Sequence, residues 1–256
     1  TEQNVQLSSV DNNYLFHEYI DGLNEPSYFH EFMTAANAFG LNYLADMELP
    51  TMFIGNQSDE AQETLKALPN IIQQEQYVDF LSNRRYRRTL LVKEDAPITR
   101  ALASLDLPEI YLDPKYAVAA SANVSNLDSI ESLDLVDIHG SGNTVKLTGE
   151  IPSLCYLALA RNHPMPMTNS EICDAVCRMK PDLDKDAVTG SWNVLSLEYL
   201  FRGLVNISTH KPDLVTKVST YPNVFQPAVE QAKTNAKVPN IKHQMIELSG
   251  EQRVIL

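Results

Sequence analysis

Residues 76–92 read QYVDFLSNRRYRRTLLV, and four of the five positions 84–88 are arginines: Arg84, Arg85, Arg87 and Arg88. The chain of 256 residues is otherwise acidic, with a formal net charge of −13. Residues 1–95 contain 6 Lys and Arg against 15 Asp and Glu, so these arginines form a positive island in a negative region. They either remain solvated or pair with acidic groups, such as the nearby carboxylates of Glu75 and Asp79.

The stretch also has the apolar spacing of a helix. A helix over residues 75–91 is predicted from four apolar residues, Tyr77, Phe80, Leu81 and Leu91. On this helix Arg84 and Arg88 would share a face, with Arg85 beside them. Arg87 would project nearly opposite Arg85. The pattern therefore predicts arginines that point in different directions from one helix.

Two more helices are predicted before this stretch. Residues 25–47, EPSYFHEFMTAANAFGLNYLADM, predict a helix with a buried stripe of Tyr28, Phe32, Ala35, Phe39 and Tyr43. Pro26 is placed where the first helical turn accepts a proline. Ser58 can cap another helix that runs to about Leu68. Residues 1–95 are therefore predicted to form a helical domain.

Residues 96–150 favour short strands. The segment LDLVDIHGSGNTVKLTG, residues 133–149, predicts a hairpin with a glycine-bearing turn, and IYLDP and KYAVAAS predict two further strands over 110–121. The HGSG turn lacks the five-residue spacing of a nucleophile elbow and the glycine fingerprint of a dinucleotide loop. This region is therefore interpreted as a connecting strand and hairpin region without catalytic residues.

Residues 151–220 predict three helices followed by a two-stranded ribbon, which is the element order of a winged helix. The first helix contains SLCYLALARNH, and Thr168 with Glu171 forms a capping box for the second. The third runs from about Asp184 to Gly203 and would bury Val188, Trp192, Leu195 and Tyr199. The segments LVNIS and LVTKVS would form the ribbon, and residues 221–256 a C-terminal extension. The predicted fold class is mainly α, within the α+β group.

The charge pattern argues against a nucleic-acid partner. A helix-turn-helix can place its last helix in the major groove, but residues 151–220 contain 7 basic and 7 acidic residues. Phosphate binding needs several unpaired cations. No apolar run approaches the roughly 18 residues of a membrane span. Without a secretory signal, and with 3 cysteines that cannot all pair, the chain is predicted to be cytoplasmic.

No metal site is predicted. Cys173 and Cys177 lie four residues apart, a spacing that suits helix packing, whereas a zinc site needs four well-spaced ligands. His17 and His30 each precede a glutamate, but neither has the second histidine of the zinc-protease motif. His17, followed by Glu18, could respond to pH or orient a partner, or it could make a structural hydrogen bond.

Three segments resemble the methyltransferase regulatory domain family: NNYLFHEYI at 12–20, EPSYFHEF with GLNYLADMEL within 25–49, and EQYVDFLSNRRYRRTLL at 75–91. The family signature Asn-Arg-x-aromatic-Arg-x-Thr-Leu-Leu is matched by Asn83, Arg84, Tyr86, Arg87, Thr89, Leu90 and Leu91. The later segments GEIPSLCYLALARNHP, FRGLVNIS and YPNVFQPAVEQAKTNAKVPNIKHQMIEL are similar to the region that follows this domain in bacterial protein-lysine methyltransferases.

The resemblance implies a non-catalytic chain that regulates a methyltransferase or positions its substrate. The glycine-rich loop of an AdoMet-binding Rossmann domain has no counterpart in the sequence. The resemblance therefore places no cofactor in this chain and AdoMet in an associated catalytic domain, in cis or in trans, with a protein as the acceptor. The alternative is a stand-alone protein-interaction module, which could be a homodimer.

Eight residues are predicted to serve as interface or structural residues: Tyr14, His17, Glu18, Tyr19, Asp79, Arg84, Tyr86 and Arg87. The signature residues Arg84 and Arg87 are expected to form internal contacts that hold the helical domain together. Arg85 and Arg88, at the variable positions of the signature, are expected to be solvated.

Overall fold

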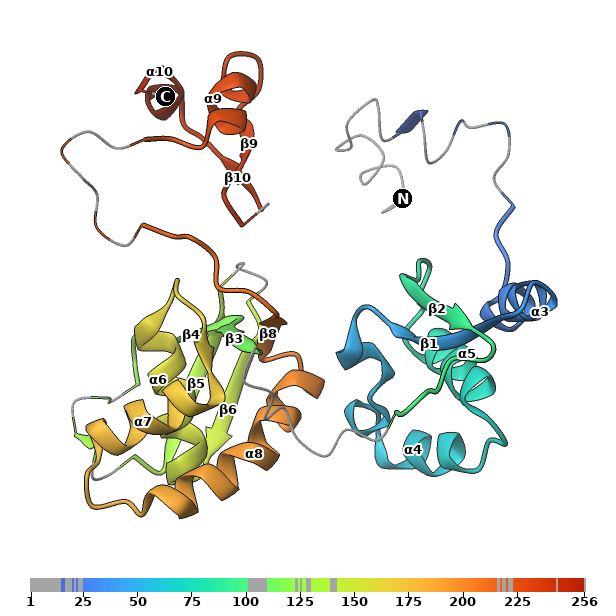
Figure 1. Cartoon of the computed structure of the whole chain (residues 1–256), viewed down its shortest axis with the longest axis horizontal. Coiled ribbons are helices and arrows are strands. Elements are labelled where there is room, and N and C mark those ends of the chain that lie inside the picture. Colours follow the sequence, from blue (N-terminus) through green and yellow to red (C-terminus); the bar gives the residue numbers. More distant parts are fainter. Residues whose placement is uncertain are drawn as a thin grey trace. The chain divides into compact units, whose positions relative to one another are not determined.

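The computed structural model describes residues 15–16, 20, 22, 25–100, 110–122, 124, 126–127, 130–138, 142–215, 217, 220, 223–242 and 244–255. The chain divides into two compact units, Thr1–Arg100 and Ala101–Leu256 (Figure 1). Both units combine helices with small antiparallel sheets, which confirms a mixed α+β class. The finer division at residues 95, 150 and 220 stays a prediction.

The N-terminal unit combines α-helices with one two-stranded sheet. Its described elements are α3 (Phe29–Ala38), β1 (Leu41–Asp46), η1 (Leu49–Met52), η2 (Ile54–Asn56), α4 (Asp59–Lys66), α5 (Ile71–Leu81) and β2 (Thr89–Lys93). Strands β1 and β2 pair antiparallel, although more than forty positions separate them in the sequence. This pairing brings the end of the arginine stretch beside the end of β1, where Thr89 is the partner of Asp46.

Helix α3 buries a different face from the predicted one. Its buried residues are Phe29, Met33 and Ala36, and these pack with Tyr43 in a core that is completed by Leu41, Met52, Ile71, Ile72 and Leu91. Of the predicted stripe, only Tyr43 is buried, while Tyr28, Phe32, Ala35 and Phe39 are exposed. Both sets have helical spacing, so the larger aromatic residues identified the wrong face.

The predicted helix over 25–47 is also too long. Gly40 has φ of 69°, a left-handed conformation that ends the helix after Ala38. Residues Leu41–Asp46 then form β1, in which Tyr43 and Asp46 are buried. The predicted helix after Ser58 is confirmed, because the Ser58 hydroxyl accepts a hydrogen bond from the Ala61 amide and α4 follows.

The C-terminal unit contains two three-stranded sheets and three longer helices. Its described elements are β3 (Tyr111–Pro114), β4 (Tyr116–Val118), β5 (Ser132–Asp137), β6 (Thr144–Thr148), α6 (Glu150–Asn162), β7 (Met167–Thr168), α7 (Asn169–Met179), α8 (Lys185–Phe201), β8 (Val205–Ser208), α9 (Gln226–Ala232), β9 (Lys237–Pro239), β10 (Met245–Glu247) and α10 (Gly250–Ile255). The sheet orders are β4-β5-β6 and β7-β3-β8, all antiparallel. The predicted hairpin is confirmed as β5 and β6.

Helix α6 lies at the centre of this unit. Its residues Ser153 to Leu159 are all buried, as expected of a helix that is covered on every side. The Tyr156 hydroxyl accepts a hydrogen bond from the Tyr116 amide at 3.0 Å and lies 3.2 Å from the Leu204 carbonyl oxygen. One buried side chain thus connects α6 to β4 and to the turn before β8.

The predicted capping box and third helix are confirmed. Thr168 accepts from the Glu171 amide, and Glu171 accepts from the Thr168 amide at 2.8 Å, which fixes the start of α7. Helix α8 begins after Asp184, whose side chain caps it. Trp192 is fully buried, and its indole Nε1 donates to Asn169 Oδ1 at 2.8 Å. This bond joins α8 to the first turn of α7.

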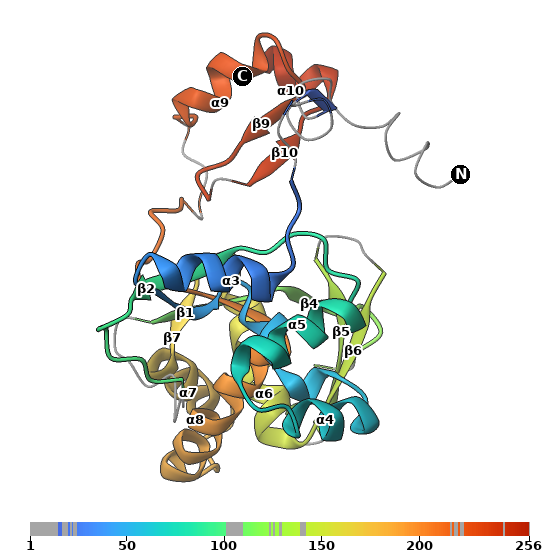
Figure 2. The same cartoon turned by 90° about the vertical axis from the view of Figure 1, so that its right-hand side faces the viewer.

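The winged-helix arrangement stays a prediction. Strand β8, the first half of the expected ribbon, pairs with β3, and residues 216, 218 and 219 of the expected second half lie outside the described part of the chain. Later in the chain, α9 and α10 lie beside the β9–β10 pair (Figure 2). Ala228 and Ala232 of α9 and Val238 of β9 form a small core with Phe225 and Leu248. No helix in the described ranges is long and apolar enough to cross a membrane.

Candidate functional site

The arginines of residues 84–88 lie on a segment between α5 and β2 that is neither helix nor strand. Helix α5 ends at Leu81, and Asn83 has φ of 48°. Asparagine is one of the few residues that adopt this left-handed conformation readily. The turn lets the Arg84 amide donate to the Asp79 carbonyl oxygen at 2.9 Å, and the chain enters β2 at Thr89. The predicted helix over 75–91 is therefore wrong beyond Leu81.

The side chains of residues 84–88 lie in two environments. The side chains of Arg84 and Arg87 are each only 11% exposed, whereas Arg85 is exposed and Tyr86 is 78% exposed. Arg88 is half-exposed and pairs with Glu48 on the surface, where such a pair contributes little stability. The predicted helical faces of the arginines are wrong, but the inward positions of Arg84 and Arg87 are confirmed.

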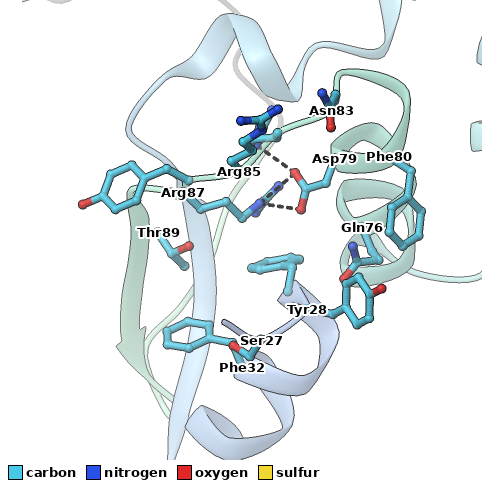
Figure 3. A pocket seen from close by; sticks show the side chains of 13 residues that line it. Ser27, Tyr28, Phe32, Gln76, Asp79, Phe80, Asn83, Arg85, Arg87 and Thr89 are labelled. Atoms are coloured by element: carbon cyan, nitrogen blue, oxygen red, sulfur yellow. Dashed lines mark hydrogen bonds and ion pairs between the residues drawn. The ribbon is translucent and has the colours of Figure 1, made fainter. Parts of the chain in front are cut away.

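Arg87 is held by two carboxylates of α5. Its Nε donates to both oxygens of Asp79, at 3.0 and 2.9 Å, and its Nη2 donates to Glu75. The guanidinium also lies over the ring of Phe29, 3.8 Å from the ring centroid, a cation–π contact. Figure 3 shows Arg87 reaching Asp79 across the pocket. Arg87 thereby joins the segment to α5 and α3.

Arg84 connects the same carboxylates to β1. Its Nη1 lies 3.3 Å from Asp79 Oδ1 and 3.6 Å from Asp46 Oδ2, and its Nη2 donates to the Thr51 carbonyl oxygen at 3.1 Å. It is also 4.0 Å from Glu75 Oε2. The two arginines therefore join α5, β1 and the η1 turn in one buried network, which we call the arginine lock: Asp46, Glu75, Asp79, Arg84 and Arg87.

The arginine lock contains one more carboxylate than guanidiniums. Burial raises the pKa of Glu75 above its ordinary value, and the hydrogen bond from Arg87 offsets this only in part. Burial would lower the pKa of Arg87, but its hydrogen bonds to Glu75 and Asp79 outweigh burial and raise it. Burial also raises the pKa of the neighbouring Tyr43 hydroxyl. Arg87 therefore stays charged, and burial opposes the ionisation of Glu75.

Two members of this site were not predicted from the sequence. Asp46 was assigned to a helix, and only the β1–β2 pairing brings it to Arg84. Phe29 was left out of the predicted buried stripe, which contained Tyr28 instead. In the structure its ring lies under the Arg87 guanidinium and makes a cation–π contact. A signal for Asp46 was available in Gly40, because a glycine after a helical run indicates a helix end and hence a new element.

A pocket of about 660 Å³ lies beside the arginine lock. It is lined by Ser27, Tyr28, Phe29, Phe32, Gln76, Asp79, Phe80, Asn83, Arg84, Arg85, Tyr86, Arg87 and Thr89 (Figure 3). A second hollow of about 290 Å³ is lined by Arg84 and Tyr86 together with residues of β1, η1 and α5. The exposed ring of Tyr86 therefore lines both hollows.

The other predicted site residues are not placed here. Tyr14, His17, Glu18 and Tyr19 lie outside the described residues. His30 lies 3.1 Å from the Gln76 side-chain oxygen through Nδ1, a structural contact between α3 and α5. Within the described ranges no group of three or more His, Cys, Asp and Glu side chains could hold a metal ion. Cys173 is buried and Cys177 half-buried, and both are free thiols.

Residues 11–93 match the family model described as a predicted methyltransferase regulatory domain. The match covers the described elements α3 to β2, and with them the whole arginine lock and both hollows. The resemblance drawn from the signature is thus confirmed for this part of the chain.

The similarity to PKMT2 from Rickettsia typhi extends over nearly the whole chain, not only over residues 11–93. The solved structure of PKMT2 matches with a TM-score of 0.84 and 25% identity over 99% of this chain, and covers 52% of that chain. The structure of PKMT2 in complex with AdoHcy matches with the same TM-score and identity over 50% of its length. An uncharacterized protein of Rickettsia prowazekii is 26% identical over 255 residues, 98% of this chain and 46% of that protein. The chain spans about half the length of these relatives.

Proposed function

We propose that this chain is the non-catalytic regulatory and substrate-positioning portion of an AdoMet-dependent protein methyltransferase. The observation that carries the proposal is the likeness of almost the entire chain to about half of PKMT2, a rickettsial protein-lysine methyltransferase whose structure has been solved with AdoHcy. The small antiparallel sheets of the described residues also support it, because AdoMet-binding Rossmann domains are built on a parallel sheet.

In this proposal the N-terminal unit packs beside the AdoMet cleft of a catalytic domain and helps to form the entrance for the acceptor. Methyl transfer depends on alignment of the acceptor with the sulfonium methyl group, so a positioning surface can contribute without supplying a base. The buried arginine lock gives this unit a firmly held core on which such a surface can be built. The C-terminal unit would support or bind the protein substrate.

The test compares the full-length protein that carries this chain with the 256-residue chain alone. With radiolabelled AdoMet and a lysine-rich acceptor protein, the full-length protein should transfer methyl groups to lysine, and the 256-residue chain should not. Calorimetry should find no micromolar AdoMet binding to the 256-residue chain. Methyl transfer or AdoMet binding by the chain alone would contradict a non-catalytic role, and no transfer by the full-length protein would contradict the assignment to a methyltransferase.

The positioning role needs a separate measurement. Tyr19→Ala and deletion of residues 151–256 should each lower kcat/KM for the acceptor while the affinity for AdoMet is retained, because a lost positioning contact weakens acceptor turnover and not cofactor binding. Circular dichroism must first show that each variant is folded. Unchanged acceptor kinetics in both folded variants would leave the chain without a positioning role.

A further inference from the structure

Arg85 and Tyr86 are presented outward by the residues on either side of them. The inward contacts of Arg84 and Arg87 fix the backbone at both ends of this pair, and the left-handed Asn83 sets its direction. Two exposed side chains on a firmly held segment lose little conformational freedom when they bind a partner. We call these two residues, with the two hollows beside Tyr86, the Tyr86 ridge.

The Tyr86 ridge adjoins exposed aromatic residues. Tyr28, Tyr77 and Phe80 are each about half exposed, and Phe80 meets both tyrosines edge to face, with ring centroids 5.7 and 6.0 Å apart. Tyr28 and Phe80 line the larger hollow. Tyrosine and arginine are the residues that most often dominate the energy of protein interfaces, and grouped exposed aromatic residues indicate such an interface.

Arg85 differs from the other arginines of the segment. Arg84, Arg87 and Arg88 all have carboxylate partners, whereas Arg85 has none among the described residues of the N-terminal unit. It lines the larger hollow (Figure 3), where the acidic residue of the lining, Asp79, is already paired with Arg84 and Arg87. The hollow therefore has both a guanidinium without a carboxylate partner among the described residues of this unit and aromatic lining residues, which suits a carboxylate next to an apolar side chain.

We propose that the Tyr86 ridge is the docking site for a segment of the catalytic portion of the same protein, and that this segment presents an Asp or Glu to Arg85 and an apolar side chain to the hollow beside Tyr86. This inference rests on the proposed function. Its occupant follows from length and charge. The relatives contain about as many residues outside the matched region as within it, and Arg85, the cation of the ridge, suits one acidic side chain of such a segment.

The experiment places the photo-cross-linker p-benzoylphenylalanine at position 86 of the full-length protein. After irradiation, mass spectrometry should identify a cross-linked peptide that lies outside the present 256 residues, contains Asp or Glu, and belongs to the same polypeptide. Arg85→Glu should reduce the yield of this cross-link by about tenfold. The matched control is Lys66→Glu, which makes the same charge change on exposed α4. A Lys substitution of the cross-linked acid should restore the yield in the Arg85→Glu protein.

Other cross-links would overturn the inference: one to a second copy of residues 1–256, one to the acceptor protein, or none from a folded protein. An equal loss of yield with Lys66→Glu would also overturn it, because the effect would then reflect net charge. The methyl-transfer assay of the unsubstituted protein separates the two proposals. Transfer with a misplaced cross-link refutes only the docking site, whereas the expected cross-link without transfer refutes only the assignment to a methyltransferase.

Discussion

Replacing Arg87 with alanine should strongly destabilise the N-terminal unit. The change removes the hydrogen bonds from Nε to both oxygens of Asp79, the bond to Glu75, and the contact with the Phe29 ring. It also leaves Glu75, whose side chain is 2% exposed, with only the 4.0 Å approach of Arg84. Removing one partner of a buried ion pair costs about 3–5 kcal/mol, which for a unit of this size lowers Tm by more than about 10 °C.

The measurement must report on the N-terminal unit alone. Hydrogen exchange of peptides from residues 25–93 follows that unit, while the fluorescence of the single Trp192 follows the C-terminal unit and serves as an internal control. Arg87→Lys should lower the free energy of unfolding by about half as much as Arg87→Ala. The ammonium group keeps the positive charge but cannot make the planar, forked contacts of a guanidinium. Arg85→Ala should change the free energy of unfolding by less than about 0.5 kcal/mol. Equal small effects of Arg85→Ala and Arg87→Ala would refute the reasoning.

Three further predictions concern single contacts. Burial raises the pKa of Glu75 above its ordinary 4.5, so its contribution to stability is present below about pH 4.5 and is lost as the pH rises through the raised value. The difference between the urea midpoints of the wild type and Glu75→Gln should therefore decrease as the pH is raised above about 4.5. A difference that stays constant or increases contradicts this. Asn169→Ala leaves the buried indole N–H of Trp192 unpaired, and fluorescence-monitored unfolding should show a loss of about 1–3 kcal/mol; an unchanged midpoint contradicts it. Lys242→Met removes the 2.8 Å contact with Asp113 and should speed hydrogen exchange in residues 225–242 by up to about tenfold. Equal changes in exchange throughout the C-terminal unit would show that this contact does not hold residues 225–242 in particular.

Local signals predicted the elements whose ends are fixed by their own residues. The capping box of Thr168 and Glu171 gave the start of α7, and the alternation around the Gly142 turn gave β5 and β6. The inward positions of Arg84 and Arg87 were also predictable from the family signature. In each case a short stretch of sequence contains both the residue and the physical reason for its structure.

Contacts between distant segments could not be predicted in this way. Strand β3 pairs with β8, almost one hundred residues later, and no local pattern specifies that partner. In the candidate site, Asp46 reaches Arg84 only because β1 pairs with β2. The face of α3 was ambiguous for a related reason: two stripes had the right spacing, and only the position of Tyr43 on β1 selects Phe29 over Tyr28.

The arginine lock also assigns the stability of the fold and the recognition of a partner to different residues of one short segment. The two residues between Arg84 and Arg87 have exposed side chains and bear none of the buried ion pairs. Their identities can therefore change at little cost to folding, whereas a one-residue insertion or deletion between the two arginines would remove one of them from its carboxylates. Over evolution, position 85, which is variable in the family signature, can acquire new binding preferences while the scaffold is maintained, and for the engineer it offers a firmly held position for a spectroscopic probe.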